Sequence, residues 1–481
     1  MPIDGASEDT ICAIATPIGE GGIGIIRISG PNATGIASQI VRLRTNRVFD
    51  TLPTHTLHLA DIISAPCPQP TSSSARSVMQ ERIIDEGLVV YMKGPHSFTA
   101  EDVVEFHCHG SMTILRRVCE ACVVAGARLA QPGEFTKRAF LNGRLDLSQA
   151  EAVLDTIKAK SEFALSIAQR QLRGELGRYV QELRTGLLSL QALVEAGIDF
   201  SDEDISFVSR DELITGLRNT AAQIQKLLDT TQTGRALRDG IRVILAGFPN
   251  VGKSSLLNSL IHDDRAIVTD VPGTTRDLIE EAVIWSGLPI TLVDTAGLRD
   301  TVDVVEQEGI RRSKDAQSQG DLILYVVDAI ELQKSGIPNS PIPVCGPKHL
   351  VVLNKIDGLA PLIKLSLCST LAERLDQRIL PVSTKTGEGL EELKMAITSR
   401  FLTASFEADE GVVISNTRHR VALEQAFTAV MQALSSIQEG TQAELLSVDL
   451  HDAADALGEI IGTITSNDVL ERIFSEFCIG K

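Results

Sequence analysis

The sequence predicts a multidomain protein in which a small α+β domain precedes a helical domain, and an α/β module is inserted into the helical part. Three observations support this prediction. The chain has 481 residues, which is too many for a single hydrophobic core. Short β-rich runs dominate the beginning, whereas a 3.6-residue apolar periodicity recurs on both sides of the centre. The centre itself carries glycine-rich and acidic motifs directly after apolar runs.

The first domain is expected to span residues 1–142 and to mix strands with helices. Residues 64–77 are rich in proline and serine, which predicts an exposed loop. Short strands separated by turns are typical of a small α+β domain. The β-rich runs occupy residues 10–15, 22–28, 56–63, 87–92 and 103–107.

A helical pattern begins near residue 147 and continues to about residue 237. Ser148 is predicted to be the N-cap of the first helix, because Glu151 follows three residues later and completes a capping box. The apolar stripe of this helix consists of Ala150, Val153, Leu154 and Ile157.

Helices are predicted again at 415–440 and 442–461, beyond the central module. An apolar stripe on a long helix must be buried against a partner. We therefore expect residues 143–237 and 402–481 to form one discontinuous all-α domain, with two separate bundles as the alternative. The inserted module is expected to span residues 238–401.

A phosphate-binding loop is predicted at residues 247–254, which match G-x-x-x-x-G-K-S/T directly after the apolar run 241–246. The glycines let backbone N–H groups converge on phosphates, Lys253 places a cation at the β/γ oxygens, and the Ser254 hydroxyl can bind Mg²⁺. A loop of this kind leaves the base undetermined. The residues assigned to it are Asn250, Val251, Gly252, Lys253, Ser254 and Ser255.

Three further motifs, each after an apolar run, predict that the base is guanine. A carboxylate such as Asp357 can accept hydrogen bonds from N1–H and the exocyclic NH₂ of guanine, a donor pair that adenine lacks. Four motifs in this order predict a Ras-like α/β P-loop GTPase domain. The residues assigned to nucleotide binding here are Asp294, Thr295, Ala296, Gly297, Asn354, Lys355, Asp357, Ser383, Thr384 and Lys385.

The segment around residues 273–277 is predicted to sense the γ-phosphate, with Thr275 completing the Mg²⁺ shell. Small GTPases orient the attacking water with a Gln directly after the D-x-x-G glycine, but Leu298 holds that position here. Another group must therefore position the water. Glu306 and Glu308 lie in a polar stretch that can fold over the phosphates, and a solvated acidic loop is the alternative.

Composition excludes several classes of function. The net charge of −18 disfavours loose, charge-driven wrapping of nucleic acid, so any RNA contact must be local or shared with a partner. The chain has no run of eighteen apolar residues, and its first ten residues carry three acids and no base. These features predict a cytoplasmic protein without membrane association.

The eight cysteines do not form paired metal-binding motifs. Cys119 and Cys122 lie in a helix-like stretch, where buried thiols are expected rather than a zinc site. His107 and His109 would share one face of a strand, and a structural role is favoured over metal binding because no second cluster of ligands is visible.

The chain resembles the MnmE (TrmE) family of bacterial tRNA-modification GTPases over essentially its whole length. Motifs this long, spread over three domains, are far more specific than the GTPase motifs alone. The segments that carry the resemblance are residues 22–30, 132–142, 196–204, 273–277, 294–299, 354–357 and the sequence Phe-Cys-Ile-Gly-Lys at 477–481.

The resemblance implies a homodimer that forms through the N-terminal domains and binds 5-formyltetrahydrofolate or a related tetrahydrofolate. It assigns the folate to Arg27, Glu105, Arg144 and Lys481, although position 144 often holds Lys in the family, which keeps the charge and changes the donor geometry. Without the resemblance, these four would be interpreted as surface or strand-end charges.

The resemblance also implies a potassium-dependent reaction in which Glu306, Lys253 and Cys478 are catalytic. Whether the Cys478 thiol reacts or only packs stays open. Mg²⁺ is assigned to Ser254 and Thr275, and K⁺ to Asn250, Thr269, Val271 and Thr274. The switch residues assigned to GTP are Thr269, Asp270, Val271, Pro272, Gly273, Thr274 and Thr275.

The implied function is modification of carbon 5 of the wobble uridine of certain tRNAs, with a group of the aminomethyl or carboxymethylaminomethyl type. A folate would supply one carbon, and the FAD-dependent protein MnmG (GidA) would be the partner in a heterotetramer. The alternative is a ribosome-assembly GTPase that acts as a switch without modification chemistry. The folate-domain motifs and Cys478 argue against that alternative.

Overall fold

The computed structural model describes residues 9–45, 47–64, 82–199, 209–261, 279–294, 320–335, 346, 348–402, 411–439 and 443–481. The chain divides into two compact units. Unit 1 contains Met1–Leu154, Gln171–Thr185 and Ala454–Lys481, and unit 2 contains Asp155–Arg170 and Gly186–Ala453. Unit 1 is therefore assembled from segments that are distant in the sequence, whereas the two segments of unit 2 flank Gln171–Thr185.

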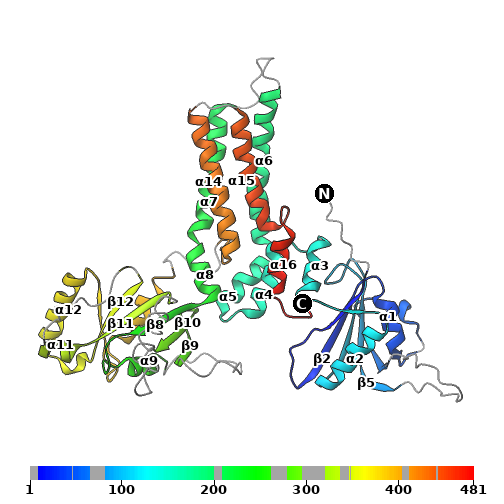
Figure 1. Cartoon of the computed structure of the whole chain (residues 1–481), viewed down its shortest axis with the longest axis horizontal. Helices are drawn as coiled ribbons and strands as arrows, with labels where there is room; N and C mark the ends of the chain where they lie inside the picture. Colours follow the sequence, from blue (N-terminus) through cyan, green and yellow to red (C-terminus); the bar gives the residue numbers. More distant parts are fainter. Residues whose placement is uncertain are drawn as a thin grey trace, which may run out of the picture. The chain divides into compact units, whose positions relative to one another are not determined.

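A seven-stranded sheet forms the centre of unit 1, with strand order β3-β4-β5-β6-β2-β1-β7. Its neighbouring strands are antiparallel except for β1 and β7. Helices α1 (Ala33–Ile40) and α2 (Met112–Val124) pack on one face over a buried apolar core (Figure 1). The strands are β1 (Ile11–Ile14), β2 (Gly21–Ser29), β3 (Val41–Leu43), β4 (Leu57–Ile63), β5 (Ile83–Met92), β6 (Val103–Gly110) and β7 (Arg128–Leu129).

The predicted α+β character of this region is confirmed. The five β-rich runs correspond to β1, β2, β4, β5 and β6, whereas β3 and β7 have only three and two residues and are too short to show alternation. Most of the predicted loop at 64–77 lies outside the described residues. Cys119 and Cys122 are buried on α2, as expected for structural thiols. Within the described residues, no group of three or more ligating side chains is arranged to hold a metal ion.

The predicted N-cap of α4 (Leu147–Lys158) is wrong. Ser148 lies inside the helix, is buried, and donates its hydroxyl to the Asp146 carboxylate at 2.6 Å. Asp146 accepts from the Gln149 backbone N–H at 2.8 Å, while the Gln149 side-chain oxygen accepts from the Asp146 N–H at 3.0 Å. The capping box is therefore formed two residues earlier than predicted, by an Asp and Gln pair that satisfies the same free N–H groups.

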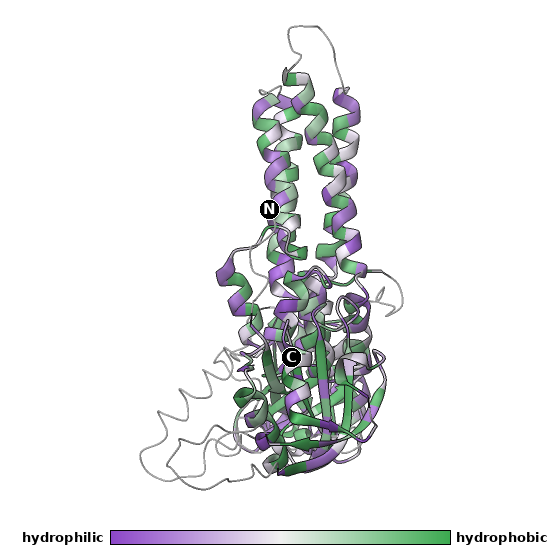
Figure 2. Ribbon diagram, turned by 90° about the vertical axis from the view of Figure 1, so that its right-hand side faces the viewer, coloured by the Kyte–Doolittle hydropathy of each residue, from purple (hydrophilic) through white to green (hydrophobic). Residues whose placement is uncertain are grey.

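Helices from both sides of the central module pack together in each unit. In unit 1, the start of α4 packs on α16 (Asn467–Ser475) through one apolar cluster. In unit 2, α7 (Arg210–Asp229) lies beside α14 (Thr417–Glu439), and Arg210 donates to the Gln438 carbonyl at 2.9 Å (Figure 1). Green and purple residues alternate along the long helices (Figure 2), so each has an apolar side to bury. Packing between helices from both sides of the module agrees with the predicted discontinuous all-α character, whereas the domain bounds 143–237 and 402–481 stay a prediction.

Ser209 caps α7 with Glu212 in a reciprocal capping box. No helix within the described ranges is both long enough and apolar enough to cross a bilayer. The other bounds are α3 (Glu134–Leu141), α5 (Glu162–Leu172), α6 (Glu175–Asp199), α8 (Thr231–Asp239) and α15 (Ala443–Ile461).

A six-stranded sheet with order β13-β12-β11-β8-β10-β9 forms the α/β part of unit 2. All neighbours are parallel except β9, which is antiparallel to β10. Separate apolar clusters cover its two faces, as expected for a buried parallel sheet. The elements are β8 (Ile241–Ala246), α9 (Lys253–Ile261), β9 (Ile279–Trp285), β10 (Leu288–Asp294), β11 (Leu322–Asp328), α11 (Ala329–Ser335), β12 (His349–Asn354), η4 (Ile356–Gly358), α12 (Pro361–Leu375), β13 (Ile379–Pro381) and α13 (Leu390–Thr398).

Candidate functional site

The predicted nucleotide motifs meet at one edge of the unit 2 sheet. Strands β8, β10, β12 and β13 are parallel, and each leads directly into one of the motifs. Because the carboxyl ends of parallel strands share an edge, the four motifs form one site. This is the edge where open α/β sheets bind ligands.

The phosphate-binding loop is held by contacts between its own backbone and the motif residues. The Lys253 ammonium donates to the carbonyls of Gly247 at 3.2 Å and Phe248 at 2.9 Å. The Ser254 hydroxyl donates to the Asp294 carboxylate at 2.6 Å, and Asp294 is fully buried. A hydroxyl and a carboxylate oxygen in contact are the hard oxygen ligands that Mg²⁺ prefers, so these residues fit the predicted metal.

Gly252 is required by close packing against the base-reading motif. Its φ is +96°, and a Cβ built there would lie 2.4 Å from Nδ2 of Asn354. That same Nδ2 donates to the Val251 carbonyl at 2.9 Å. The loop and the Asn354 motif are therefore locked to each other, and no side chain fits between them.

The residues predicted to read the base orient one another. Ser383 donates its hydroxyl to Asp357 at 2.8 Å, which fixes the carboxylate predicted to read guanine. The Lys355 backbone N–H donates to Oδ1 of Asn354 at 2.8 Å. The Lys355 ammonium crosses to the P-loop, where it donates to the Asn250 carbonyl at 2.8 Å. These contacts connect the phosphate end of the site to the base end.

Asp328 supports this site and was missed by sequence reasoning. It forms an ion pair of 2.7 Å with Lys355 and accepts from the backbone N–H of Ile330 at 2.9 Å. Burial opposes its ionisation, but the hydrogen bonds from Lys355 and from the start of α11 hold its pKa below the usual range. The available signal was an acid at the end of the apolar run 322–327.

Some residues predicted for the nucleotide site form no hydrogen bond with the other described motifs, and others lie outside the described residues. The side chains of Ser255 and Lys385 are exposed and form no hydrogen bond with another described residue, while the Thr384 N–H approaches Oδ1 of Asn354 at 3.5 Å. Asn250 has φ of +63° and an exposed side chain. The predicted switch, water-positioning and motif residues at 269–275, 295–297 and 306 lie outside the described residues.

A second group of predicted residues gathers on the face of the unit 1 sheet that lies opposite α1 and α2. Arg27 on β2 and Glu105 on β6 are register partners, and the Arg27 Nε donates to Glu105 at 2.7 Å. His107, two residues along the same strand, lies 3.4 Å from the other Glu105 oxygen. Burial opposes the ionisation of Glu105, but the contacts with His107 and Arg27 hold its pKa below the usual range.

The segment at 478–481 docks beside this pair. Ile479 forms an isolated β-bridge with Pro132, and the Cys478 carbonyl accepts from Gly133 at 3.5 Å. Gly480 has φ of +98°, and a Cβ there would lie 2.2 Å from the Ile14 carbonyl. Partial burial and the nearby Arg27 cation lower the pKa of Lys481. Lys481 therefore lies within electrostatic range of Arg27 and Glu105, whereas the Cys478 side chain is exposed.

Arg144 lies near Arg27, because both side chains contact Phe98. The two guanidinium groups share one aromatic ring, with the Arg27 Cζ 5.4 Å and the Arg144 Cζ 5.6 Å from the ring centre. Arg144 also donates to the Phe98 carbonyl at 2.9 Å. Phe98 and His107 were not predicted as site residues.

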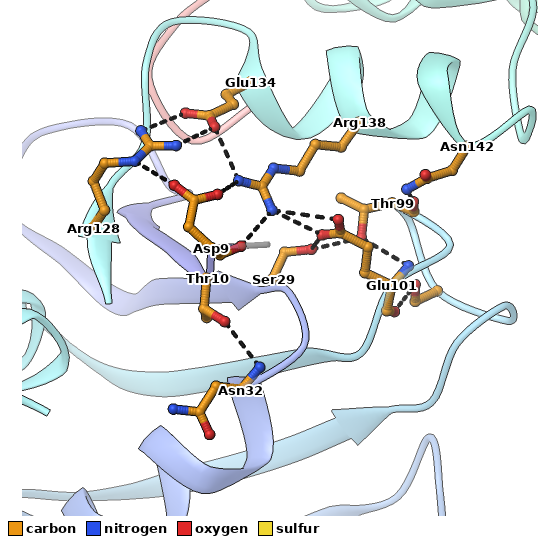
Figure 3. A network of polar contacts seen from close by, with 11 residues as sticks. Asp9, Thr10, Ser29, Asn32, Thr99, Glu101, Arg128, Glu134, Arg138 and Asn142 are labelled. Carbon is orange, nitrogen blue, oxygen red and sulfur yellow. Dashed lines mark hydrogen bonds and ion pairs between the residues drawn. The ribbon is translucent and has the colours of Figure 1, made fainter. Parts of the chain in front are cut away.

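A buried ionic network holds α3 against the sheet and the loop that carries Phe98 (Figure 3). Its centre is Arg138, which is 4% exposed and pairs with Asp9 at 2.7 Å and with Glu134 at 3.1 Å. It also contacts Glu101 at 3.3 Å. The network continues through Ser29, which contacts the Glu101 carboxylate at 2.7 Å and the Thr99 hydroxyl at 2.6 Å.

Replacing Arg138 with Met is expected to destabilise unit 1 by about 1–3 kcal/mol, because the largely buried Glu101 would lose its cation, whereas Arg128 still pairs with Asp9 and Glu134. Thermal unfolding of the whole chain, followed by circular dichroism, measures the effect. Arg116→Met is the matched control, since its ion pair with Glu120 is 79% and 59% exposed and is expected to contribute at most about 1 kcal/mol. Equal midpoints for the two variants would contradict a structural role of the network.

Comparisons with known proteins agree with this geometry. The family model described as the GTP-binding protein TrmE N-terminus matches residues 10–144, and the MnmE helical domain model matches residues 147–478. A tRNA modification GTPase MnmE of Heliobacterium modesticaldum is 43% identical over 479 residues, which cover 98% of this chain and 99% of that protein. The Bacillus subtilis tRNA modification GTPase MnmE is 41% identical over 475 residues, which cover 98% and 100%.

Among solved structures, the G domain of the T. maritima FeoB iron transporter is similar to part of the chain. It is 29% identical, covers 33% of this chain and 97% of its own, and has a TM-score of 0.24. The two family models and the near full-length relatives show both domain types around the nucleotide site described above. The chain belongs to the MnmE family of tRNA modification GTPases, and it is a GTP hydrolase that takes part in tRNA modification.

Proposed function

We propose that the chain is a potassium-dependent GTPase that acts in the cytoplasm with the FAD-dependent partner MnmG on carbon 5 of the wobble uridine of certain tRNAs. A tetrahydrofolate such as 5-formyltetrahydrofolate supplies the one-carbon unit, and the product group is of the aminomethyl or carboxymethylaminomethyl type. The observation that carries the folate assignment is the docking of segment 478–481, which brings Lys481 to the Arg27 and Glu105 pair. Membership of the MnmE family favours this function over ribosome assembly.

The charges of the unit 1 site suit a folate. Arg27, Arg144 and Lys481 supply cations for the carboxylates of its tail, and Glu105 supplies an acceptor for the N–H groups of a pterin edge. The Phe98 ring, already in contact with both guanidinium groups, offers an aromatic surface. The exposed Cys478 thiol lies beside this site as the proposed reactive group.

Exposed leucines on β4 and β5, on the same face of the sheet, support the proposed homodimer. Leu57, Leu59 and Leu88 are 51%, 47% and 37% exposed, and they lie opposite the face covered by α1 and α2. The register places Leu57 beside Val90, and Val90 beside Glu105. An apolar strip next to the folate residues is a surface that a second copy can cover.

For GTP hydrolysis, each proposed residue has one physical task. Lys253 neutralises charge at the β/γ oxygens, Ser254 and Thr275 hold Mg²⁺, and Glu306 orients the attacking water in place of the Gln that Leu298 replaces. When bound, K⁺ adds a positive charge beside the phosphates. The Asn250 amide is exposed and forms no hydrogen bond with another described residue, which leaves its oxygen available to an ion, with Thr269, Val271 and Thr274 as the other proposed ligands.

Nucleoside analysis tests the proposed function. A bacterial strain that lacks its own MnmE is complemented with this chain, and bulk tRNA is digested and separated by liquid chromatography with mass spectrometry. Restoration of the modified wobble uridine supports the proposal. Normal growth and ribosome profiles with unmodified tRNA would favour the assembly switch instead.

GTP turnover is expected to be at least about tenfold faster in K⁺ than in Na⁺ at equal ionic strength. Removing the Asn250 amide should lower the K⁺-stimulated kcat by about 10²-fold, the usual scale for one transition-state ligand. Asn250→Gly is the variant to use, because φ of +63° would strain an alanine. Steady-state phosphate release, measured in both salts, gives the two rates. Full K⁺ stimulation of the Asn250→Gly variant would contradict the proposed K⁺ site.

A further inference from the structure

A basic cavity of about 760 Å³ lies in unit 2, away from the nucleotide motifs. Ile241 and Leu322, the first residues of β8 and β11, line it together with Lys348, which directly precedes β12. These positions are the amino ends of the parallel strands. The nucleotide motifs follow the opposite, carboxyl ends, so this cavity is separate from the GTP site.

The cavity is lined by cations from different elements. Arg235 comes from α8, Lys348 from the turn before β12, Arg400 from the end of the module after α13, and Arg420 from α14. Among the described lining residues, the single acid is Asp321. The formal charge of the lining is therefore +3, in a chain whose net charge is −18.

The acid in the cavity is already occupied by protein groups. One Asp321 oxygen accepts from Arg235 at 2.7 Å, and the other accepts from the backbone N–H of Arg242 at 2.9 Å. Arg420 pairs with Glu424, outside the lining, at 3.2 Å, and both side chains are exposed. Within the described residues, Lys348 forms no ion pair. The four lining cations therefore exceed Asp321 and Glu424, the two acids paired with them here, by two charges.

We propose that this cavity binds backbone phosphates of RNA. A concave surface with one sign of charge concentrates the electrostatic field, which lets a locally basic site attract a polyanion despite the negative chain. Cations spread over four elements match several phosphates rather than one carboxylate, and guanidinium groups bind phosphate oxygens in pairs. The exposed hydroxyl of Thr417 in the lining can donate to the same oxygens.

An RNA is favoured over an acidic protein because the family acts on tRNA, and in this respect the inference rests on the proposed function. The cavity joins α8 and α14 to the amino edge of the nucleotide-binding sheet. RNA bound there would contact the helical part and the GTPase part of unit 2 at once. Any coupling between RNA and nucleotide affinities would then be reciprocal.

The test measures tRNA binding by the whole chain as a function of salt. Lys348→Glu combined with Arg400→Glu reverses two lining charges. Fluorescence anisotropy with labelled bulk tRNA from about 50 to 200 mM KCl should show at least about tenfold weaker binding, and the slope of log K against log salt should fall by about 1.4–1.8. GTP turnover without RNA should be unchanged, because neither residue lies at the nucleotide edge.

The matched control is Arg218→Glu combined with Lys226→Glu, which makes the same charge change on the exposed surface of α7 outside the cavity. This control should retain most of the affinity and the wild-type slope. If the charge reversal lowers the thermal midpoint, Lys348→Gln decides instead, with an expected slope change of about 0.7–0.9.

Three outcomes would overturn the inference. They are no tRNA binding by the wild-type chain, a wild-type slope in the cavity variants, and an equal loss in the control. Polyglutamate that binds with the same sensitivity to the cavity variants, while tRNA binding is unaffected, would assign the cavity to an acidic protein segment. Nucleoside analysis judges the proposed function independently of all these measurements.

Discussion

Asp357→Asn is expected to weaken GTP binding by about 10²–10⁴-fold. The carboxylate is predicted to accept two hydrogen bonds from guanine, and hydrogen bonds to a charged group are worth roughly 1.5–3 kcal/mol each. Ser383 already orients this carboxylate at 2.8 Å, so an asparagine amide would occupy the same position and turn a donor toward the donors of the base. Isothermal titration calorimetry with GDP and GTP measures the loss.

A xanthine nucleotide separates base recognition from general damage to the site. Xanthine carries a carbonyl where guanine carries NH₂, so the amide introduced by Asp357→Asn can donate to it while its oxygen accepts from N1–H. This variant should therefore bind xanthosine triphosphate better than the wild-type chain does. Asp376→Asn, an exposed acid after α12 in a left-handed conformation that asparagine tolerates, should leave both affinities unchanged. Loss of both nucleotides by Asp357→Asn would contradict a role in base selection.

Deleting residues 478–481 is expected to weaken 5-formyltetrahydrofolate binding and to abolish tRNA modification, while GTP affinity persists. The deletion removes Lys481, whose charge-assisted hydrogen bond to a folate carboxylate would contribute roughly 1.5–3 kcal/mol, and it removes the bridge between Ile479 and Pro132. The nucleotide motifs lie in unit 2 and lose no residue. Calorimetry with the folate and nucleoside analysis of tRNA measure the two expected losses.

Two point variants divide this effect into its parts. Lys481→Met keeps the docked segment and removes only the cation, so folate affinity should fall by about 10–100-fold, the equivalent of one such bond. Gly480→Ala should displace the segment, because its Cβ would lie 2.2 Å from the Ile14 carbonyl. Wild-type folate affinity in the deletion variant would contradict a folate site shared by Lys481 and Arg27. It would also contradict any chemical role of Cys478.

Sequence reasoning was strongest where one local pattern determines both structure and position. A strand followed by a glycine-rich loop places Lys253 and Ser254, and the other motifs fall at the same sheet edge for the same reason. The capping box shows the limit of such patterns, since Asp146 with Gln149 formed the box, whereas Ser148 with Glu151 was predicted. Spacing along the chain alone did not locate the first turn of the helix.

The features that the sequence did not reveal are contacts between residues that are far apart along the chain. Arg138 and Asp9 are separated by 129 residues, and nothing near either residue indicates the other. The basic cavity likewise collects its four cations only after the sheet and helices are packed. Family resemblance assigned Lys481 to the Arg27 site, but the close approach of Gly480 and the β-bridge that hold its segment became visible only in three dimensions.

The division of unit 1 into separated segments also imposes an order on biosynthesis. Ala454–Lys481 is translated after Leu154 by about 300 residues, which takes roughly 15–60 s at the usual rates of about 5–20 residues per second. During that interval the apolar side of α4, including Leu147 and Ala150, has no α16 to cover it. The nascent chain therefore exposes a hydrophobic surface while unit 2 emerges from the ribosome. We expect chaperones that bind during translation to recognise this surface.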